Sequence, residues 1–206
     1  METHNFRFSR ILSFILHPLL IPSIATLILL LRPDIYPIVL PGNLKIWFIS
    51  LIFTFTFIIP AAAVLLLLKL NKIYSIELNN RTERTVPLLI SSISYLALLF
   101  IMKPAGIPPV FLYVLYSAAF ALLAGLLINL VYKISLHSLG WGALAAMLIS
   151  ISIRMGIPLL PLIIISVILS GVVGYARLKE NAHNQTQVYL GYFAGVCIVI
   201  LFTFFS

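Results

Sequence analysis

The chain has 206 residues, of which 62% are hydrophobic and 9% are charged, and 13 Lys+Arg against 5 Asp+Glu give it a formal net charge of +8. A soluble domain contains roughly 45–50% apolar residues, so this composition predicts an integral membrane protein with no separate soluble domain. The basic residues are spread over short connections, without the grouped aromatics of a nucleic-acid-binding face, and no nucleic-acid partner is expected.

Long apolar runs follow one another along the whole chain. About 20 mostly apolar residues cross a bilayer, so the runs predict an all-α, polytopic membrane bundle of six or seven transmembrane helices that forms one domain over residues 1–206. The third and fifth runs are short, and a six-crossing arrangement with one partial or tilted segment stays open. The runs cover about 11–31, 45–70, 87–102, 109–132, 139–153, 158–175 and 188–205.

The first run begins after a basic segment, as a signal peptide does. It is long, contains Pro18 and Pro22 and has no small-residue cleavage site, so we interpret it as the first membrane helix. His17 lies inside this run, where an ionisable group needs a partner or a water-filled cavity. Two interpretations are open: His17 lines a substrate access path, or it is neutral and bonds a carbonyl freed by Pro18.

Two connections share a basic residue followed by a glycine and a proline, Lys103 to Pro108 and Arg154 to Pro158. Glycine accepts the left-handed conformation that ends a helix, and a cation suits that end of the helix dipole. Proline is tolerated at the first position of the next helix. Both segments are therefore predicted to be tight hairpins on one side of the membrane.

Polar clusters follow the second, fourth and sixth runs, so the parity of the crossings predicts that all three face one side. The clusters are Arg81 to Pro87, Lys133 to Ser138 and Arg177 to Gln187. Arg81 and Arg84 belong either to a site or to a loop anchored at the lipid headgroups.

In the third cluster, Gln187 follows His183 at a spacing that allows it to orient the imidazole ring. If Asn181 or a neighbour caps the last helix, His183 lies in its first turn and Gln187 one turn later on the same face. Gln187 can then bond one imidazole nitrogen and leave the other for nucleophilic attack or proton transfer. The helix start also offers N–H groups and positive potential to a phosphate.

The second cluster repeats this arrangement, because Ser135 or Ser138 is a predicted N-cap and His137 opens a helix. Together with the basic residues, the two histidines predict a cationic, acid-poor site for a phosphate dianion. Neither histidine has a carboxylate at ligand spacing, so no metal site and no cofactor is predicted. The cations assigned to the phosphate are Arg81, Arg84, Lys133 and Arg177, with Ser135 and Ser138 as further phosphate-binding residues.

The third cluster resembles a motif of the membrane branch of the type 2 phosphatidic acid phosphatase superfamily, S-R-x5-H-x3-D. Ala176-Arg177, His183 and Gln187 reproduce its spacing, with Ala in place of Ser and Gln in place of Asp. A neutral Gln187 can orient His183 but cannot stabilise an imidazolium as a carboxylate does.

The other two motifs of that superfamily, K-x6-R-P and P-S-G-H, are matched less fully. Ser135-Leu136-His137 resembles the second, with the Pro absent and Leu in place of Gly. The first is represented by an arginine-rich segment that ends at Pro87, with Glu77 at the position of the Lys. The resemblance covers residues about 81–187 and implies a core similar to that of the phosphatases and haloperoxidases of this superfamily.

The resemblance implies a metal-independent lipid phosphatase of the bacterial cytoplasmic membrane, multi-pass, with its site facing away from the cytoplasm. His183 would attack phosphorus to give a phosphohistidine, His137 would protonate the leaving oxygen, and the cations would hold the phosphoryl group. The implied substrates are lipid phosphates or diphosphates: phosphatidate, phosphatidylglycerophosphate, a prenyl diphosphate or a lipid A type. Two other functions stay open, a silent member that binds or transports a lipid phosphate, and a small transporter or structural subunit.

Overall fold

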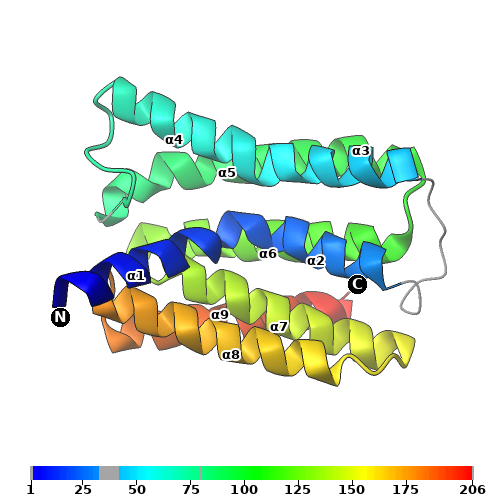
Figure 1. Ribbon diagram of the computed structural model, residues 1–206. Helices are drawn as coiled ribbons and strands as arrows, with labels where there is room; N and C mark the ends of the chain where they lie inside the picture. The colour runs from blue at the N-terminus through cyan, green and yellow to red at the C-terminus, as the bar shows by residue number, and fades with distance from the viewer. Residues whose placement is uncertain (1, 33–41, 79, 206) are drawn as a thin grey trace. The chain divides into compact units, whose positions relative to one another are not determined.

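The computed structural model describes residues 2–32, 42–78 and 80–205, and all regular structure in these residues is helical (Figure 1). The helices are α1 (Glu2–Ile15), η1 (Pro18–Leu20), α2 (Ile21–Leu31), α3 (Gly42–Phe53), η2 (Thr54–Ile58), α4 (Ile59–Lys69), α5 (Arg81–Met102), η3 (Lys103–Ala105), α6 (Pro109–Val131), α7 (Leu136–Met155), α8 (Leu160–Lys179) and α9 (Gln185–Phe205).

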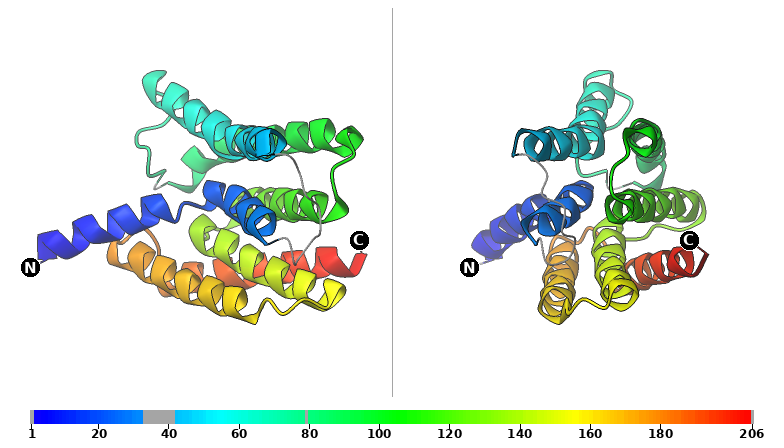
Figure 2. Two further views of the ribbon diagram at one scale, coloured as in Figure 1. Left: turned by 45° about the vertical axis from the view of Figure 1, so that its right-hand side comes forward. Right: turned by 90° about the vertical axis from the view of Figure 1, so that its right-hand side faces the viewer.

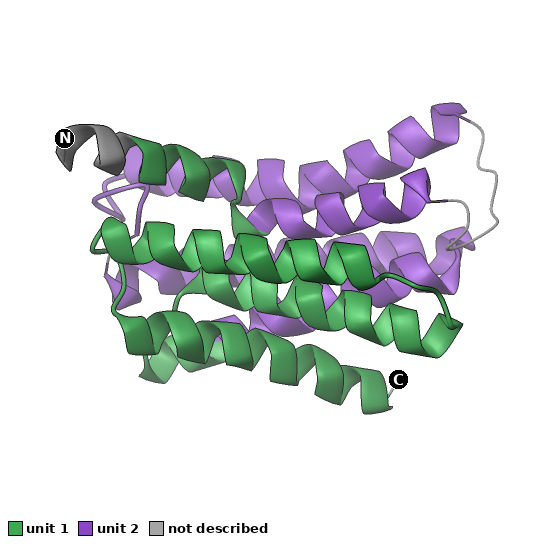
Figure 3. Ribbon diagram, turned by 60° about the horizontal axis from the view of Figure 1, so that its bottom comes forward, with its two compact units in different colours: residues 1–18, 127–206 green, residues 19–126 purple. Residues whose placement is uncertain are grey.

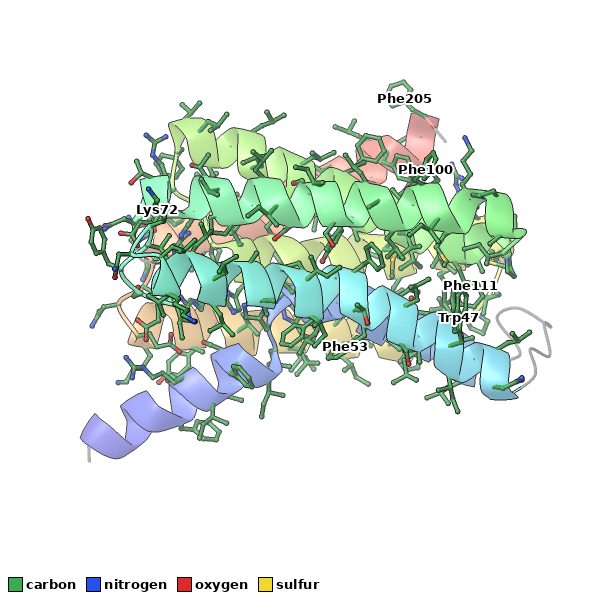
Figure 4. All side chains as sticks on the ribbon, turned by 90° about the horizontal axis from the view of Figure 1, so that it is seen from above. Trp47, Phe53, Lys72, Phe100, Phe111 and Phe205 are labelled. Atoms are coloured by element: carbon green, nitrogen blue, oxygen red, sulfur yellow. The ribbon has the colours of Figure 1, made fainter. Side chains whose placement is uncertain are left out.

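Seven helical segments among the described residues are long and apolar enough to cross a membrane, which agrees with the predicted six or seven. The third and fifth, for which short crossings were expected, are 25 and 20 residues long. The segments are Phe8–Leu31, Gly42–Lys69, Arg81–Ala105, Pro109–Val131, Leu136–Met155, Leu160–Lys179 and Gln185–Phe205. Large apolar side chains project outward along these helices, such as Phe205 at the end of α9, which is 89% exposed (Figure 4). Such exposure suits contact with lipid.

The chain divides into two compact units, each described separately (Figure 3). Unit 1 comprises Met1–Pro18 and Leu127–Ser206, and unit 2 comprises Leu19–Leu126. The prediction of one membrane domain over residues 1–206 stays a prediction.

Unit 1 is built around α7, which packs against both α8 and α9, while α1 packs on α8 (Figure 2). The approach of α7 to α9 depends on glycine. A methyl group on Gly142 would overlap the backbone carbonyl of Tyr192, and one on Gly195 would overlap that of Leu139. Small residues at such positions let two membrane helices meet backbone to backbone. This contact places the starts of α7 and α9 beside each other.

Unit 2 contains a break in helical hydrogen bonding at the π-helix η2, shortly before Pro60. Proline has no N–H and its ring crowds the carbonyl four residues earlier. Side chains of α5 bond carbonyls of this segment: Ser94 Oγ donates to the Phe55 oxygen at 2.6 Å, and Tyr95 donates to the Thr56 oxygen at 3.4 Å. Backbone acceptors inside an apolar span are satisfied in this way.

The first apolar run was expected to be one helix, and here the structure differs. The α1 helix ends at Ile15, and the chain passes through His17 and η1 before α2 begins. Pro18 explains the break, because it disfavours the helical conformation of the residue before it and cannot donate a backbone hydrogen bond. The break leaves carbonyl groups near the end of α1 that need partners.

Both predicted glycine turns are present, and their location on one side of the membrane stays a prediction. Gly106 and Gly156 have φ of 67° and 65°, in the left-handed region that closes a helix. The following helices begin at Pro109 and Leu160, so Pro108 and Pro158 precede their helices and do not occupy the first helical position.

Candidate functional site

His183 and Gln187 form the hydrogen bond that their spacing predicts. Nδ1 of His183 lies 2.9 Å from Oε1 of Gln187, and His183 is 7% exposed. An amide oxygen only accepts, so Nδ1 carries the hydrogen. Nε2 of a neutral His183 then holds a lone pair, as a nucleophilic imidazole requires.

The cap of α9 differs from the expected one. Asn184 caps the helix through a 2.9 Å bond from the Gln187 backbone N–H to Oδ1, so His183 lies before the first turn and not within it. Asn181 instead closes α8 in the left-handed conformation, with φ of 53° and its N–H bonded to the Leu178 oxygen. Gln187 Oε1 also accepts from the Asn184 N–H at 3.4 Å. Gln187 therefore belongs to a capping box as well as to the His183 bond.

Ser135, one of the two expected caps, is the N-cap of α7. Its Oγ accepts from the Ser138 backbone N–H at 3.3 Å and from the Ser138 hydroxyl at 3.0 Å, and both serines are fully buried. The Ser135 N–H donates to the Gln187 carbonyl at 3.0 Å. The starts of α7 and α9 are thus joined, and both serines have structural partners.

His137 and Trp141 lie one turn apart on α7 and both donate to the broken first helix. Nε2 of His137 lies 3.0 Å from the Ser13 carbonyl, and Nε1 of Trp141 donates to the Leu16 carbonyl at 3.0 Å. A carbonyl only accepts, so His137 is the donor. Nδ1 is the nitrogen of His137 that faces away from this bond.

His17 packs edge-on against His137, with ring centroids 5.2 Å apart and planes at 77°. His137 bonds a carbonyl of α1, and both interpretations of His17 stay predictions. His137 also lies within electrostatic range of Arg177 and His183. The end of α1, the start of α7, the end of α8 and the start of α9 therefore meet in unit 1.

Arg177 is buried and pairs with a residue that the sequence prediction left out. Its Nη1 lies 2.6 Å from Oε2 of Glu180, and the two side chains are 8% and 9% exposed. Oε1 of Glu180 accepts from the Ser13 hydroxyl at 2.7 Å. The expected acid-poor site thus contains a buried carboxylate.

The remaining predicted cations belong to both units. Lys133 is half-buried in the connection before α7 in unit 1. Arg81 and Arg84 belong to unit 2, where buried Arg84 donates from Nε to the Leu78 carbonyl at 2.6 Å. Arg84 thereby anchors the connection before α5, and a phosphate role for either arginine stays a prediction.

Sequence reasoning missed Glu180, Ser13 and Trp141. Glu180 follows Arg177 by three residues, which signals a possible ion pair at a helix end. Ser13 and Trp141 carry no such local signal, because their partners are more than 100 residues away. No group of three or more metal-binding side chains occurs in the described part of the chain.

Searches with protein-family models, among curated proteins and among solved structures give no match to this chain.

Proposed function

We propose that this protein is a membrane lipid phosphatase that removes a phosphoryl group from a lipid phosphomonoester or diphosphate through a phosphohistidine. The observation that carries the proposal is the bond from buried His183 to Gln187, which fixes the proton on Nδ1 and leaves Nε2 as nucleophile. The resemblance of the Arg177, His183 and Gln187 spacing to a phosphatase motif supports the same reaction. The cluster lies at the ends of apolar helices. In this proposal the lipid head binds there while its tail stays in the membrane.

In the proposed first step, Nε2 of His183 forms a bond to phosphorus as the bond to the lipid oxygen breaks. Protonated His137 gives the Nδ1 proton to that oxygen, while its Nε2 stays bonded to the Ser13 carbonyl. In the second step, water attacks phosphorus, the N–P bond breaks, and His137 recovers a proton from the water. The products are the shortened lipid and inorganic phosphate, and Arg177 and Lys133 hold the phosphoryl oxygens.

The test is phosphate release by purified protein in detergent from a panel of lipid phosphates, with a chelator present. We expect release to fall about 100-fold or more in His183→Ala and His137→Ala, and to be unchanged in Lys179→Ala, which removes an exposed charge nearby. A phosphate ester with an acidic leaving group should restore much of the His137→Ala rate and none of the His183→Ala rate. Unchanged release in both histidine variants would falsify the proposal.

A second candidate function is binding or transport of a lipid phosphate without hydrolysis. The carboxylate of Glu180 favours it, because this carboxylate neutralises part of the positive charge that Arg177 offers to a phosphoryl group. The neutral amide of Gln187 also favours it, because it cannot stabilise the imidazolium of a reacting His183. This function predicts saturable binding of lipid phosphate, no phosphate release, and loss of binding in Arg177→Ala.

A further inference from the structure

The two carboxylate oxygens of Glu180 accept hydrogen bonds from residues of two different helices. Oε2 accepts from Arg177 on α8 at 2.6 Å, and Oε1 accepts from Ser13 on α1 at 2.7 Å. Glu180 itself is the C-cap residue of α8, and its backbone N–H is bonded to the Ala176 carbonyl at 3.0 Å. The backbone of Glu180 is thus fixed, and its side chain joins two elements.

Ser13 connects this ion pair to the histidine cluster. Its hydroxyl donates to Glu180 while its carbonyl accepts from His137, so one buried residue of α1 contacts both sides of the site. A charge-assisted hydrogen bond in such a buried place is stronger and more directional than one in water. The position of α1 and the orientation of the Arg177 guanidinium are therefore set together.

We propose that Glu180 is a positioning residue, which braces Arg177 against Ser13 so that α1 becomes part of the anion site. The inference rests on the proposed function, because the anion is the phosphoryl group of that reaction. A guanidinium has five N–H donors in a rigid plane, so a bond from Nη1 to Glu180 fixes the direction of the rest. An arginine held in this way loses less conformational freedom when it binds a phosphoryl oxygen.

The first test compares KM and kcat for a lipid phosphate in mixed micelles among Glu180→Ala, Glu180→Gln and the control Lys179→Ala. Gln keeps an acceptor for Arg177, and its amide N–H can donate to the Ser13 oxygen, so the brace survives without the charge. We expect KM to rise about tenfold in Glu180→Ala and to stay within about twofold in Glu180→Gln and the control.

Three results would overturn the proposal. A lower KM in both Glu180 variants would mean that Glu180 competes with substrate for Arg177. An unchanged KM in both would mean that Glu180 does not position the arginine. A fall in kcat alone, together with a lower thermal midpoint, would mean that Glu180 only supports folding, because unfolding removes active sites without changing the KM of those that remain.

A second test is independent of activity. The thermal midpoints of the wild type, Ser13→Ala, Glu180→Ala and the double variant form a double-mutant cycle. We expect the midpoint of the double variant to fall by less than the sum of the two single-variant decreases. Additive losses would overturn the brace. A wild-type protein that neither binds nor hydrolyses lipid phosphate would refute the proposed function, and the cycle would then decide by itself whether Glu180 holds α1.

Discussion

Nε2 of His137 donates a 3.0 Å hydrogen bond to the backbone carbonyl of Ser13, close to the end of α1. With this bond His137 satisfies a backbone carbonyl near the point where the first helix ends, in addition to its proposed role as a general acid. The two roles use different ring nitrogens, Nε2 for the carbonyl and Nδ1 for the leaving oxygen. They are therefore separable by substitution.

We expect His137→Gln to keep a thermal midpoint close to that of the wild type, because the Gln amide N–H can reach the position of Nε2. We expect His137→Asn to lower the midpoint, since its shorter amide does not reach the Ser13 carbonyl and a lost buried hydrogen bond costs about 1 kcal/mol. Both should lose hydrolysis of substrates with poor leaving groups. Thermal unfolding in detergent and phosphate release measure the two effects, and equal midpoints would argue against the Ser13 bond.

Gln187 offers a test of how much charge matters at His183. Gln187→Ala removes the acceptor at 2.9 Å and should lower kcat about 100-fold, because the imidazole loses its orientation and tautomer. Gln187→Glu keeps the acceptor and adds a charge that stabilises the imidazolium, so its kcat should equal or exceed the wild-type value. A kcat for Gln187→Glu as low as that of Gln187→Ala would contradict this role.

Substitutions at Ser135 distinguish a role in helix capping from a role in phosphate binding. Ser135→Ala removes the N-cap of α7 and should destabilise the protein by about 1 kcal/mol, measured by thermal unfolding. Ser135→Asn restores a capping oxygen and should recover most of that loss. If Ser135→Asn is as stable as the wild type but binds lipid phosphate more weakly, the hydroxyl contacts the ligand; equal binding assigns Ser135 to the cap alone.

The contact of α7 with α9 predicts a sharp contrast between two glycines. Gly195→Ala places a methyl group against the Leu139 carbonyl and should destabilise the protein by about 3 kcal/mol or prevent folding, because the backbones must separate. Gly171→Ala, in open space on α8, is the matched control and should be neutral or stabilise by up to about 1 kcal/mol. Folded yield and thermal midpoint in detergent measure both, and equal behaviour would exclude the close contact.

The sequence alone determined the local features of this protein. Seven apolar runs predicted six or seven spans, and the structure has seven candidates among the described residues. Such spans are predictable because each helix satisfies its own backbone hydrogen bonds in lipid, whichever helices lie beside it. The glycine hairpins at Gly106 and Gly156 and the bond from His183 to Gln187 were likewise predictable, since each depends on residues within a few positions. A local rule also misled: Asn181 and Asn184 both suit a helix end, and only the backbone path showed which one caps α9.

Tertiary structure alone decided the partners that lie far apart in the chain. Ser13 meets Glu180 across 167 positions, and His137 meets the Ser13 carbonyl across 124. No periodicity or motif encodes such pairs, because they result from how α1, α7 and α8 pack. Because of that packing, Arg177, which was predicted to belong to a cluster of cations, pairs with the buried carboxylate of Glu180. The packing also lets Ser13 of α1 contact both Glu180 and His137.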